Sequence, residues 1–328
     1  MRILITGGAG YIGSHAVKAL TESHTVTVVD NLTRGYRDAV PSNVNLYTND
    51  VREISKMTQI LRSEKIDAVL HFAGLAYVGE SVAQPLRYYQ VNVDGTLSLL
   101  AAMKEVGVNQ LVFSSSCATY GTPDFLPITE QTPQRPINPY GWSKLMAEQL
   151  IKDVAASRPN FSYALLRYFN VAGCATDGTL GERHNPEPHL IPLALRAVLN
   201  PHQPLIIHGD DYATEDGTCQ RDYLHVEDVV LAHQLVLEAL QTHDRMVYNL
   251  GLGHPYSVRD IIAAVATVTG SDVPIIVGTR RLGDPPCLYA DASSIRTQLG
   301  WQPTQIDLVN TIASSWRWLK GMDAYPRY

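Results

Sequence analysis

The chain has 328 residues and a formal net charge of −6, from 26 Lys and Arg against 32 Asp and Glu. Its few lysines are scattered and form no basic stripe, which excludes a nucleic acid as an expected partner. A glycine-rich segment begins at Gly7, and no apolar run reaches the roughly 18 residues of a membrane span, so we expect neither a signal peptide nor a membrane partner.

The first thirty residues predict a strand, a glycine turn, a helix and a second strand that ends in an acid. The apolar run 2–6 leads into the turn 7–13, and the run 26–29 ends at Asp30. Glycines allow a pyrophosphate to approach the amides at a helix N-terminus, where the helix dipole favours negative charge. Asp30 stands where a carboxylate binds the adenosine ribose and repels a 2′-phosphate. The segment therefore predicts NAD binding.

Strands and helices alternate over the first 170 residues. Further buried strands are predicted at 68–72, 111–114 and 164–167, and helices at 12–21, 53–62, 85–106 and 141–156. Parallel neighbours need helical crossovers, so the fold class is α/β, with a doubly wound parallel sheet of the Rossmann type. Prolines and glycines then cluster at 173–188. We predict an NAD-binding domain over 1–170 and a smaller α/β substrate lobe over 171–328, and leave open whether later segments return to the sheet.

Three residue types needed for hydride and proton transfer fall near the same sheet edge. Tyr140 and Lys144 lie four apart on one helix face, so the ammonium can favour the ionised phenol and lower its pKa. Ser116 follows the strand 111–114. A Ser, Tyr and Lys trio beside a nicotinamide is suited to oxidation of an alcohol. The alternative is a solvent-facing Lys144 beside a core tyrosine.

The four cysteines lie far apart in the sequence and form no Cys-x-x-Cys pair; they are Cys117, Cys174, Cys219 and Cys287. We therefore expect no metal site and no disulfide framework, and reduced thiols fit a cytoplasmic protein.

Seven sequence motifs, distributed along the chain, carry a resemblance to a known family. They are Gly7-Gly8-Ala9-Gly10-Tyr11-Ile12-Gly13-Ser14-His15, Asp30-Asn31-Leu32, His71-Phe72-Ala73-Gly74, Val78-Gly79-Glu80-Ser81, residues 140–144, Leu166-Arg167-Tyr168-Phe169-Asn170 and Arg221-Asp222-Tyr223-Leu224-His225-Val226. With them the chain resembles an extended short-chain dehydrogenase/reductase and is similar over essentially its full length to the UDP-glucose (UDP-galactose) 4-epimerases.

The resemblance implies a reaction and a set of site residues. In that family a tyrosine takes the proton of the sugar 4-hydroxyl while C4 passes a hydride to tightly bound NAD, and the 4-keto sugar rotates before the hydride returns. The implied catalytic residues are Tyr140, Lys144 and Ser116. The implied cofactor residues are Gly7, Gly10, Tyr11, Ile12, Gly13, Asp30, Asn31, Asp50, Val51, Phe72, Ala73, Asn92, Ser114, Tyr140, Lys144 and Phe169. The implied UDP-sugar residues are Ser116, Tyr140, Asn170, His189, Leu190, Leu205, Ile206, His208, Arg221, Arg281, Asp284 and Cys287.

Three positions depart from the pattern of the best-known bacterial members. Ala76 replaces a lysine that assists cofactor binding there, so NAD is expected to have one charge contact fewer. His189 stands where some relatives have asparagine, and we expect it to contact a phosphate or the uridine. Cys287 replaces a tyrosine that walls the sugar pocket, which predicts space for the acetamido group of UDP-GlcNAc or UDP-GalNAc.

Alternative functions are separated by a few residues. Dehydratases of the superfamily carry an Asp-Glu pair after the active-site Ser or Thr, whereas Cys117-Ala118 stands here, so dehydration is disfavoured. A UDP-xylose/UDP-arabinose 4-epimerase would use the same chemistry and stays open. A non-catalytic NAD-binding regulator is the remote alternative, which the intact catalytic trio argues against. Family members dimerise through the helices matching 85–106 and 141–156, so a homodimer is expected.

Overall fold

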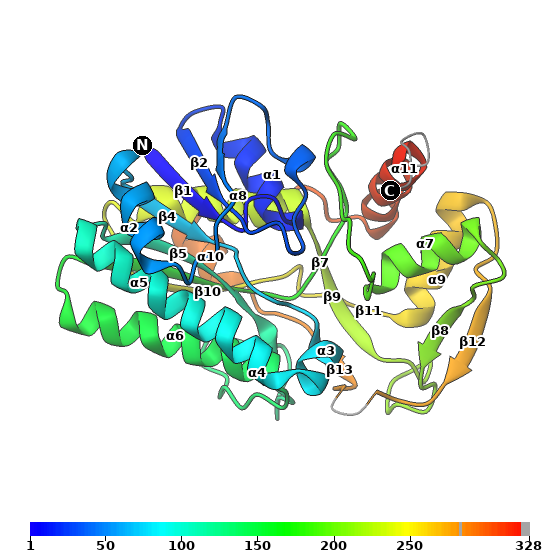
Figure 1. Cartoon of the computed structure of the whole chain (residues 1–328). Coiled ribbons are helices and arrows are strands. Elements are labelled where there is room, and N and C mark those ends of the chain that lie inside the picture. The colour runs from blue at the N-terminus through cyan, green and yellow to red at the C-terminus, as the bar shows by residue number, and fades with distance from the viewer. Residues whose placement is uncertain (282–283, 323–328) are drawn as a thin grey trace.

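The computed structural model describes residues 1–281 and 284–322; residues 282–283 and 323–328, all in the predicted second lobe, lie outside the described residues. Its centre is a seven-stranded, wholly parallel sheet in the order β10-β6-β5-β4-β1-β2-β3 (Figure 1). The strands are β1 (Arg2–Thr6), β2 (Thr25–Val29), β3 (Asn45–Tyr47), β4 (Ala68–His71), β5 (Gln110–Ser116), β6 (Ser162–Tyr168) and β10 (Arg245–Leu250). This order reverses between β1 and β4, as in dinucleotide-binding sheets. The predicted α/β fold class is confirmed.

Helices cover both faces of this sheet, because each presents an apolar stripe of period 3.6 to it. One face packs against α1 (Tyr11–Leu20), α8 (Val226–Ala239) and α10 (Ser293–Leu299), and the other against α2 (Ile54–Ser63), α5 (Gly95–Val106) and α6 (Pro139–Ser157) (Figure 1). In α1, for example, Ala16, Val17 and Leu20 are fully buried against the sheet.

The helix predicted over 85–106 is not a single α-helix. It consists of α4 (Pro85–Tyr88), a π-helical turn (Tyr89–Asp94) and α5, and a short helix, α3 (Val78–Ala83), precedes it. The wide π-turn contains Asn92, whose amide accepts from Leu75 N at 2.8 Å and donates to Leu75 O at 3.0 Å. The deviation from α-geometry thus fixes the loop that follows β4. Two 3-10 turns, Arg37–Ala39 and Cys117–Thr119, complete this part of the chain.

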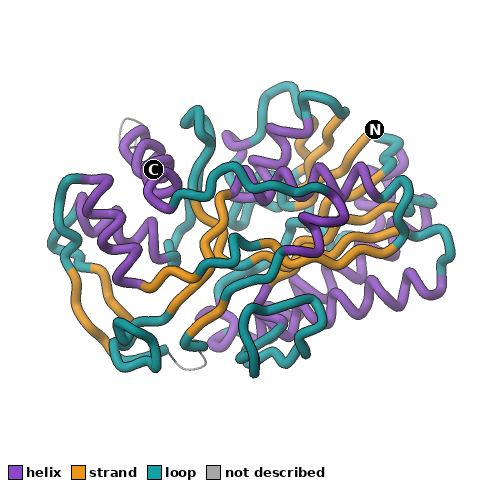
Figure 2. Tube along the Cα trace, turned by 180° about the vertical axis from the view of Figure 1, so that it is seen from behind, coloured by secondary structure: helices purple, strands orange, loops and turns teal. Residues whose placement is uncertain are grey.

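A second group of elements lies at the carboxyl ends of the strands and is seen from behind in Figure 2. Its helices are α7 (Leu190–Leu199), α9 (Val258–Thr269) and α11 (Leu308–Met322), which share one apolar core. Its strands are β8 (Leu205–His208) with β12 (Ile275–Gly278), and β7 (Asn170–Ala172), β9 (Gln220–His225), β11 (Pro255–Ser257) and β13 (Cys287–Leu288). The chain after residue 170 therefore supplies this lobe and also returns to the main sheet through α8, β10 and α10. The boundary near residue 170 stays a prediction.

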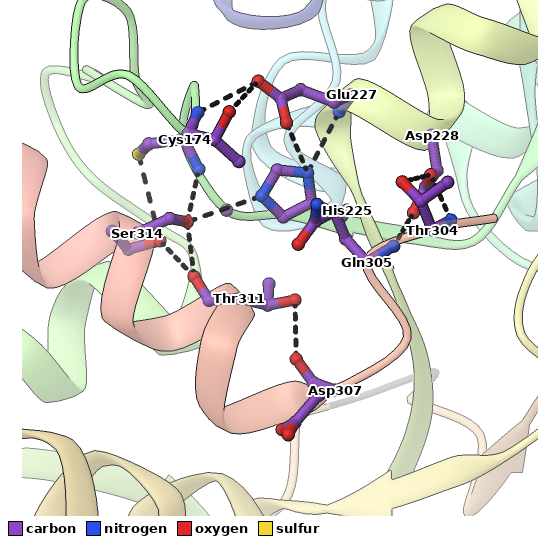
Figure 3. Close-up of polar contacts among 12 residues, drawn as sticks. Cys174, His225, Glu227, Asp228, Thr304, Gln305, Asp307, Thr311 and Ser314 are labelled. Carbon is purple, nitrogen blue, oxygen red and sulfur yellow. Dashed lines mark hydrogen bonds and ion pairs between the residues drawn. The ribbon is translucent and has the colours of Figure 1, made fainter.

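A polar network fastens α11 to the rest of the molecule (Figure 3). His225, at the end of β9, accepts from Glu227 N through Nδ1 at 3.2 Å, and its Nε2 lies 3.5 Å from Ser314 Oγ on α11. Cys174 N donates to the same Ser314 hydroxyl at 2.9 Å. The C-terminal helix is thereby tied to β9 and to the chain after β7. None of the helices in the described part of the chain is long and apolar enough to cross a membrane.

Candidate active site

A single cleft of about 1500 Å³ opens between the carboxyl ends of the sheet strands and the second lobe. Among the described residues it gathers nearly all the predicted site residues. These are Gly7, Gly10, Tyr11, Ile12, Gly13, Asp30, Asn31, Asp50, Val51, Phe72, Ala73, Ser114, Ser116, Tyr140, Lys144, Phe169, Asn170, His189, Leu190, Leu205, Ile206, His208, Arg221, Arg281 and Asp284. Asn92 and Cys287 do not line it.

The glycine turn forms one end of the cleft and fits a dinucleotide. Helix α1 starts after Gly10, which offers no side-chain cap, so the first amides of the helix are left for a ligand. A Cβ on Gly13 would collide with the Gly7 carbonyl oxygen, so this position of the turn requires glycine. These bare amides at a helix start match the pyrophosphate of NAD.

Asp30 is held at the next strand end by the backbone. Its carboxylate accepts from Ala9 N at 3.0 Å and from Leu32 N at 2.8 Å, and the side chain is buried. Burial raises the pKa of Asp30, while these two hydrogen bonds oppose the rise. A fixed carboxylate with unused lone pairs facing the cleft fits the ribose hydroxyls of an adenosine.

The three predicted catalytic side chains meet near the middle of the cleft. Ser116 ends β5, and Tyr140 and Lys144 lie on the first turns of α6. The helix start approaches the chain after β5 closely, since a Cβ on Gly141 would collide with the carbonyl oxygen of Ala118. All three of these side chains are buried.

The charge state of this trio differs from the sequence-based expectation. Burial raises the pKa of Tyr140 to about 12, and a hydrogen bond with Ser116 only partly opposes this. Burial also lowers the pKa of Lys144 to about 8. The Lys144 ammonium donates to the Ser114 carbonyl oxygen at 2.8 Å rather than to the phenol. In this structure, therefore, burial and not the charge of Lys144 determines the direction in which the pKa of Tyr140 shifts.

Asn92 lies behind the cleft wall. Besides its bonds to Leu75, its amide donates to Ser143 Oγ at 2.8 Å, which joins the π-turn to α6. A cofactor contact by Asn92 remains a prediction, whereas its structural role in placing α6 is directly visible.

The opposite end of the cleft carries the predicted UDP residues. Arg221, on β9, forms an ion pair with Asp284 and donates to the Gln220 carbonyl oxygen at 2.7 Å. Ile206 on β8 is 50% exposed and offers an apolar surface beside His208. Cys287, on β13, pairs in register with Gln220 on β9 and directly precedes the cleft residue Leu288.

The structure adds cleft residues that the sequence analysis missed. These are Arg34, Tyr77, Glu182 and His184, among others. The Arg34 guanidinium lies 4.5 Å from the Tyr77 ring centroid, and the Tyr77 ring contacts His184 and His189 edge-on. The available signal was the spacing of two acids and two histidines over 182–189, which the sequence analysis did not weigh.

Comparisons with known proteins agree with this geometry. Residues 3–251 match the model of the NAD dependent epimerase/dehydratase family. A UDP-glucose 4-epimerase of Lactobacillus helveticus is 48% identical over 98% of this chain and 97% of its own length. The structure of UDP-glucose 4-epimerase from Bifidobacterium longum in complex with NAD⁺ and UDP is 40% identical, covers 98% of both chains and has a TM-score of 0.93. The UDP-Glc/GlcNAc 4-epimerase from Campylobacter jejuni is also 40% identical, covers 98% of this chain and 99% of its own, and has a TM-score of 0.85.

Proposed function

We propose, from the premise that this chain belongs to the NAD-dependent epimerase/dehydratase family, that it interconverts UDP-glucose and UDP-galactose by inverting C4 of the sugar. The observation that carries the proposal is the meeting of Ser116, Tyr140 and Lys144 in one cleft with the glycine turn at one end and Arg221 at the other. This arrangement suits a nucleotide sugar laid toward a dinucleotide.

The cofactor end of the cleft binds NAD through the turn at Gly7 to Gly13 and through Asp30. When bound, NAD supplies a reversible hydride acceptor for C4. Gly10 and Tyr11, at the start of α1, would hold the pyrophosphate, and Lys144 would bind the nicotinamide ribose. Ala76 brings no charge to this wall, so NAD retention depends on these backbone and carboxylate contacts.

Tyr140 is the general base for the sugar 4-hydroxyl. With a pKa of about 12 the Tyr140 phenol keeps its proton near neutral pH. A nearby positive charge must lower this pKa before Tyr140 can accept the proton of the sugar hydroxyl. The ammonium of Lys144, one helical turn further on, is the chain's own source of that charge. Ser116 donates to or accepts from the reacting oxygen. In the return step Tyr140 gives the proton back to the 4-keto oxygen.

The UDP end must hold its part of the substrate while the sugar turns. Arginine suits bidentate contacts with a diphosphate, and Arg221 and Arg281 both line this end. Asn170 contacts a phosphate, Asp284 binds the uridine ribose, and the segment 205–208 packs on uracil. His189 contacts a phosphate or the uridine through Nε2, because its Nδ1 faces Glu182 and Glu187. Asp284 forms an ion pair with Arg221 in this structure. When UDP binds, this pair must therefore loosen so that Arg221 can contact the diphosphate and Asp284 the ribose.

The test is to purify the protein without added cofactor, measure bound NAD, and follow UDP-galactose, UDP-GalNAc and UDP-xylose by product chromatography. Formation of UDP-glucose with no net change in the cofactor's redox state supports the proposal. Conversion of UDP-xylose alone would assign the pentose epimerase. No conversion with NAD supplied would favour a non-catalytic regulator or an enzyme that acts on a different nucleotide sugar.

A second substrate class follows from Cys287. Cys287 itself does not line the cleft, but its neighbour Leu288 does, and from the small size of the thiol we propose UDP-GlcNAc and UDP-GalNAc as further substrates. The likeness to the Campylobacter jejuni enzyme supports this. Inactivity on both, with normal turnover of UDP-galactose, would reject it.

We also propose a homodimer formed through α5 and α6. Large apolar side chains are exposed there, with Leu97 51%, Trp142 43% and Met146 41% exposed. Sedimentation velocity on the protein and on Trp142→Glu tests this, since the variant should be monomeric. A cytoplasmic location is proposed from the four free cysteines, which suit a reducing compartment.

A further inference from the structure

Four side chains of the segment between β7 and α7 converge on one point in the cleft wall. They are Glu182, His184, Glu187 and His189, in the spacing Glu-x-His-x-x-Glu-x-His. One potential ligand atom from each lies within 4.8 Å of all the others. Three of them, Glu182, His184 and His189, also line the cleft, so the point is reachable from solvent.

The separations between these atoms suit a single ion. His189 Nδ1 lies 2.6 Å from Glu182 Oε1 and 2.9 Å from Glu187 Oε1. His184 Nδ1 lies 3.2 and 3.6 Å from the same two oxygens. Ligands at about 2.0–2.1 Å around a tetrahedral zinc ion stand about 3.3 Å apart, which falls inside the observed range.

The two buried carboxylates of this cluster require compensating positive charge, which either protonated histidines or a bound cation can supply. The Glu182 and Glu187 side chains are only 6% and 1% exposed, and two neighbouring buried carboxylates repel each other unless positive charge compensates them. His189, 41% exposed, can bridge both carboxylates with one proton.

Two polar atoms of the cluster still lack a hydrogen-bond partner in the described part of the chain when His189 bridges the two carboxylates. Among the described residues, His184 Nδ1 and the Oε2 oxygen of the buried Glu187 have no hydrogen-bond partner. A buried polar atom without a partner is costly and points to a missing ligand. A divalent cation would engage His184 directly and neutralise both carboxylates, in place of the protons that the two histidines would otherwise carry.

We propose that Glu182, His184, Glu187 and His189 bind one divalent transition-metal ion with the ligand preferences of Zn²⁺. Imidazole nitrogen and carboxylate oxygen in fourfold coordination are typical of zinc, and four protein ligands leave no open position for catalysis. The ion is therefore structural. It fastens the segment that lies between Tyr11, at the start of α1, and α7, with the Tyr11 and Tyr77 rings packed edge-on against His184.

The experiment uses the full chain, purified without chelator and without a histidine tag. Metal content is measured by plasma mass spectrometry, and the protein is then stripped and titrated with Co²⁺, whose visible d–d bands report tetrahedral coordination. We expect one equivalent of metal, intense Co²⁺ bands, and a rise in Tm when Zn²⁺ is restored. His184→Ala should weaken Co²⁺ binding by more than about tenfold.

Two further variants make the result decisive. His202→Ala changes an exposed histidine in the turn after α7, outside the cluster, and should bind Co²⁺ as the parent does. Glu187→Gln keeps the side-chain shape and serves if His184→Ala does not fold. Absence of Co²⁺ bands in the parent protein, or equal binding by the parent and Glu187→Gln, would overturn the proposal and leave a proton as the bridge. These readouts do not depend on epimerase activity.

Discussion

Arg167 Nη2 lies 2.6 Å from Glu148 Oε2, and the two side chains are 3% and 0% exposed. The pair joins β6 to α6, the helix that carries Tyr140 and Lys144. Ser115 Oγ also donates to Glu148 Oε1 at 2.6 Å, which adds β5 to the contact. Burial alone would raise the pKa of Glu148, but the hydrogen bonds and charge of Arg167 hold it below its usual value. The Arg167–Glu148 pair therefore holds α6 against β6, and the Ser115 hydrogen bond holds it against β5, which ends in Ser116.

Arg167→Met should lower the free energy of unfolding by about 3 kcal/mol, because the buried Glu148 charge loses its bidentate partner and keeps only the partly exposed Lys152 as a counter-charge, at 3.3 Å. Guanidinium denaturation measures the change. The matched control is Arg62→Met, which breaks an ion pair with Glu105 whose partners are 63% and 56% exposed, and should alter stability by less than about 1 kcal/mol. An equally small effect of Arg167→Met would show that the buried pair does not stabilise the helix.

Tyr140→Phe should reduce kcat by about 10²- to 10⁴-fold, as expected for loss of a general base, and leave bound NAD and UDP affinity near normal. Steady-state kinetics and UDP calorimetry give both quantities. Tyr248→Phe is the control, since Tyr248 is also buried but hydrogen-bonds Gln298 away from the cleft. Turnover that survives in Tyr140→Phe would remove the phenol as the base.

Acid should destabilise the protein between pH 6.5 and 5. Burial lowers the pKa of His71 to about 3 and those of His15 and His233 to about 4. Below the unfolded-state value of about 6.5, the unfolded chain binds protons that the folded protein does not, so the free energy of unfolding falls with falling pH.

Urea midpoints at pH 7.5 and 5 test this expectation. His233→Leu removes one of these groups and should reduce the difference between the two midpoints. The substitution is sterically suitable because the His233 ring already packs on Phe72, at 4.6 Å between centroids, and its Nε2 has no partner among the described residues. Identical midpoints at both pH values in the parent protein would contradict the expectation.

The parts of the fold that the sequence predicted are those with local signals. The run 2–6, the glycine turn and the run that ends at Asp30 all lie within the first thirty residues. They form β1, the start of α1 and β2, as expected. The pairing of β10 with β6 was not predictable in this way, because residues 245–250 join a strand some eighty positions earlier and no local pattern specifies that partner. The π-turn within 85–106 was missed for a related reason: it depends on the contact of Asn92 with the loop after β4.

The candidate site shows the same division. Residue type and spacing indicated Tyr140, Lys144 and Ser116 as a group, and all three line one cleft, while their catalytic roles stay predictions. The pKa of Tyr140 could not be obtained in this way, because spacing places Lys144 on the same helix face but does not report burial or the competing Ser114 carbonyl oxygen. Burial is a property of the whole fold.

Cys287→Tyr should abolish turnover of UDP-GlcNAc and UDP-GalNAc and spare UDP-galactose. The proposal expects the larger ring to project past Leu288, which lines the cleft, and to take the space that an acetamido group requires. Product chromatography with each substrate measures the ratio. Cys287→Ser, which keeps the side chain small, is the control and should retain both activities. Undiminished acetamido turnover in Cys287→Tyr would place that group elsewhere in the cleft.

Asp30→Asn should weaken NAD binding by about 10- to 150-fold, the range expected for loss of a charged hydrogen bond of 1.5–3 kcal/mol. The asparagine has one acceptor oxygen, so it cannot serve both Ala9 N and Leu32 N, and a modest loss of stability should accompany the change. NAD content after purification and titration of the stripped protein give the affinity. Asp67→Asn is the matched control, because Asp67 also accepts from a backbone amide, that of Arg2 at 2.7 Å, but lies outside the cleft. An unaltered NAD content in Asp30→Asn would remove the ribose assignment, since the two backbone bonds alone would then explain why an acid stands at the end of β2.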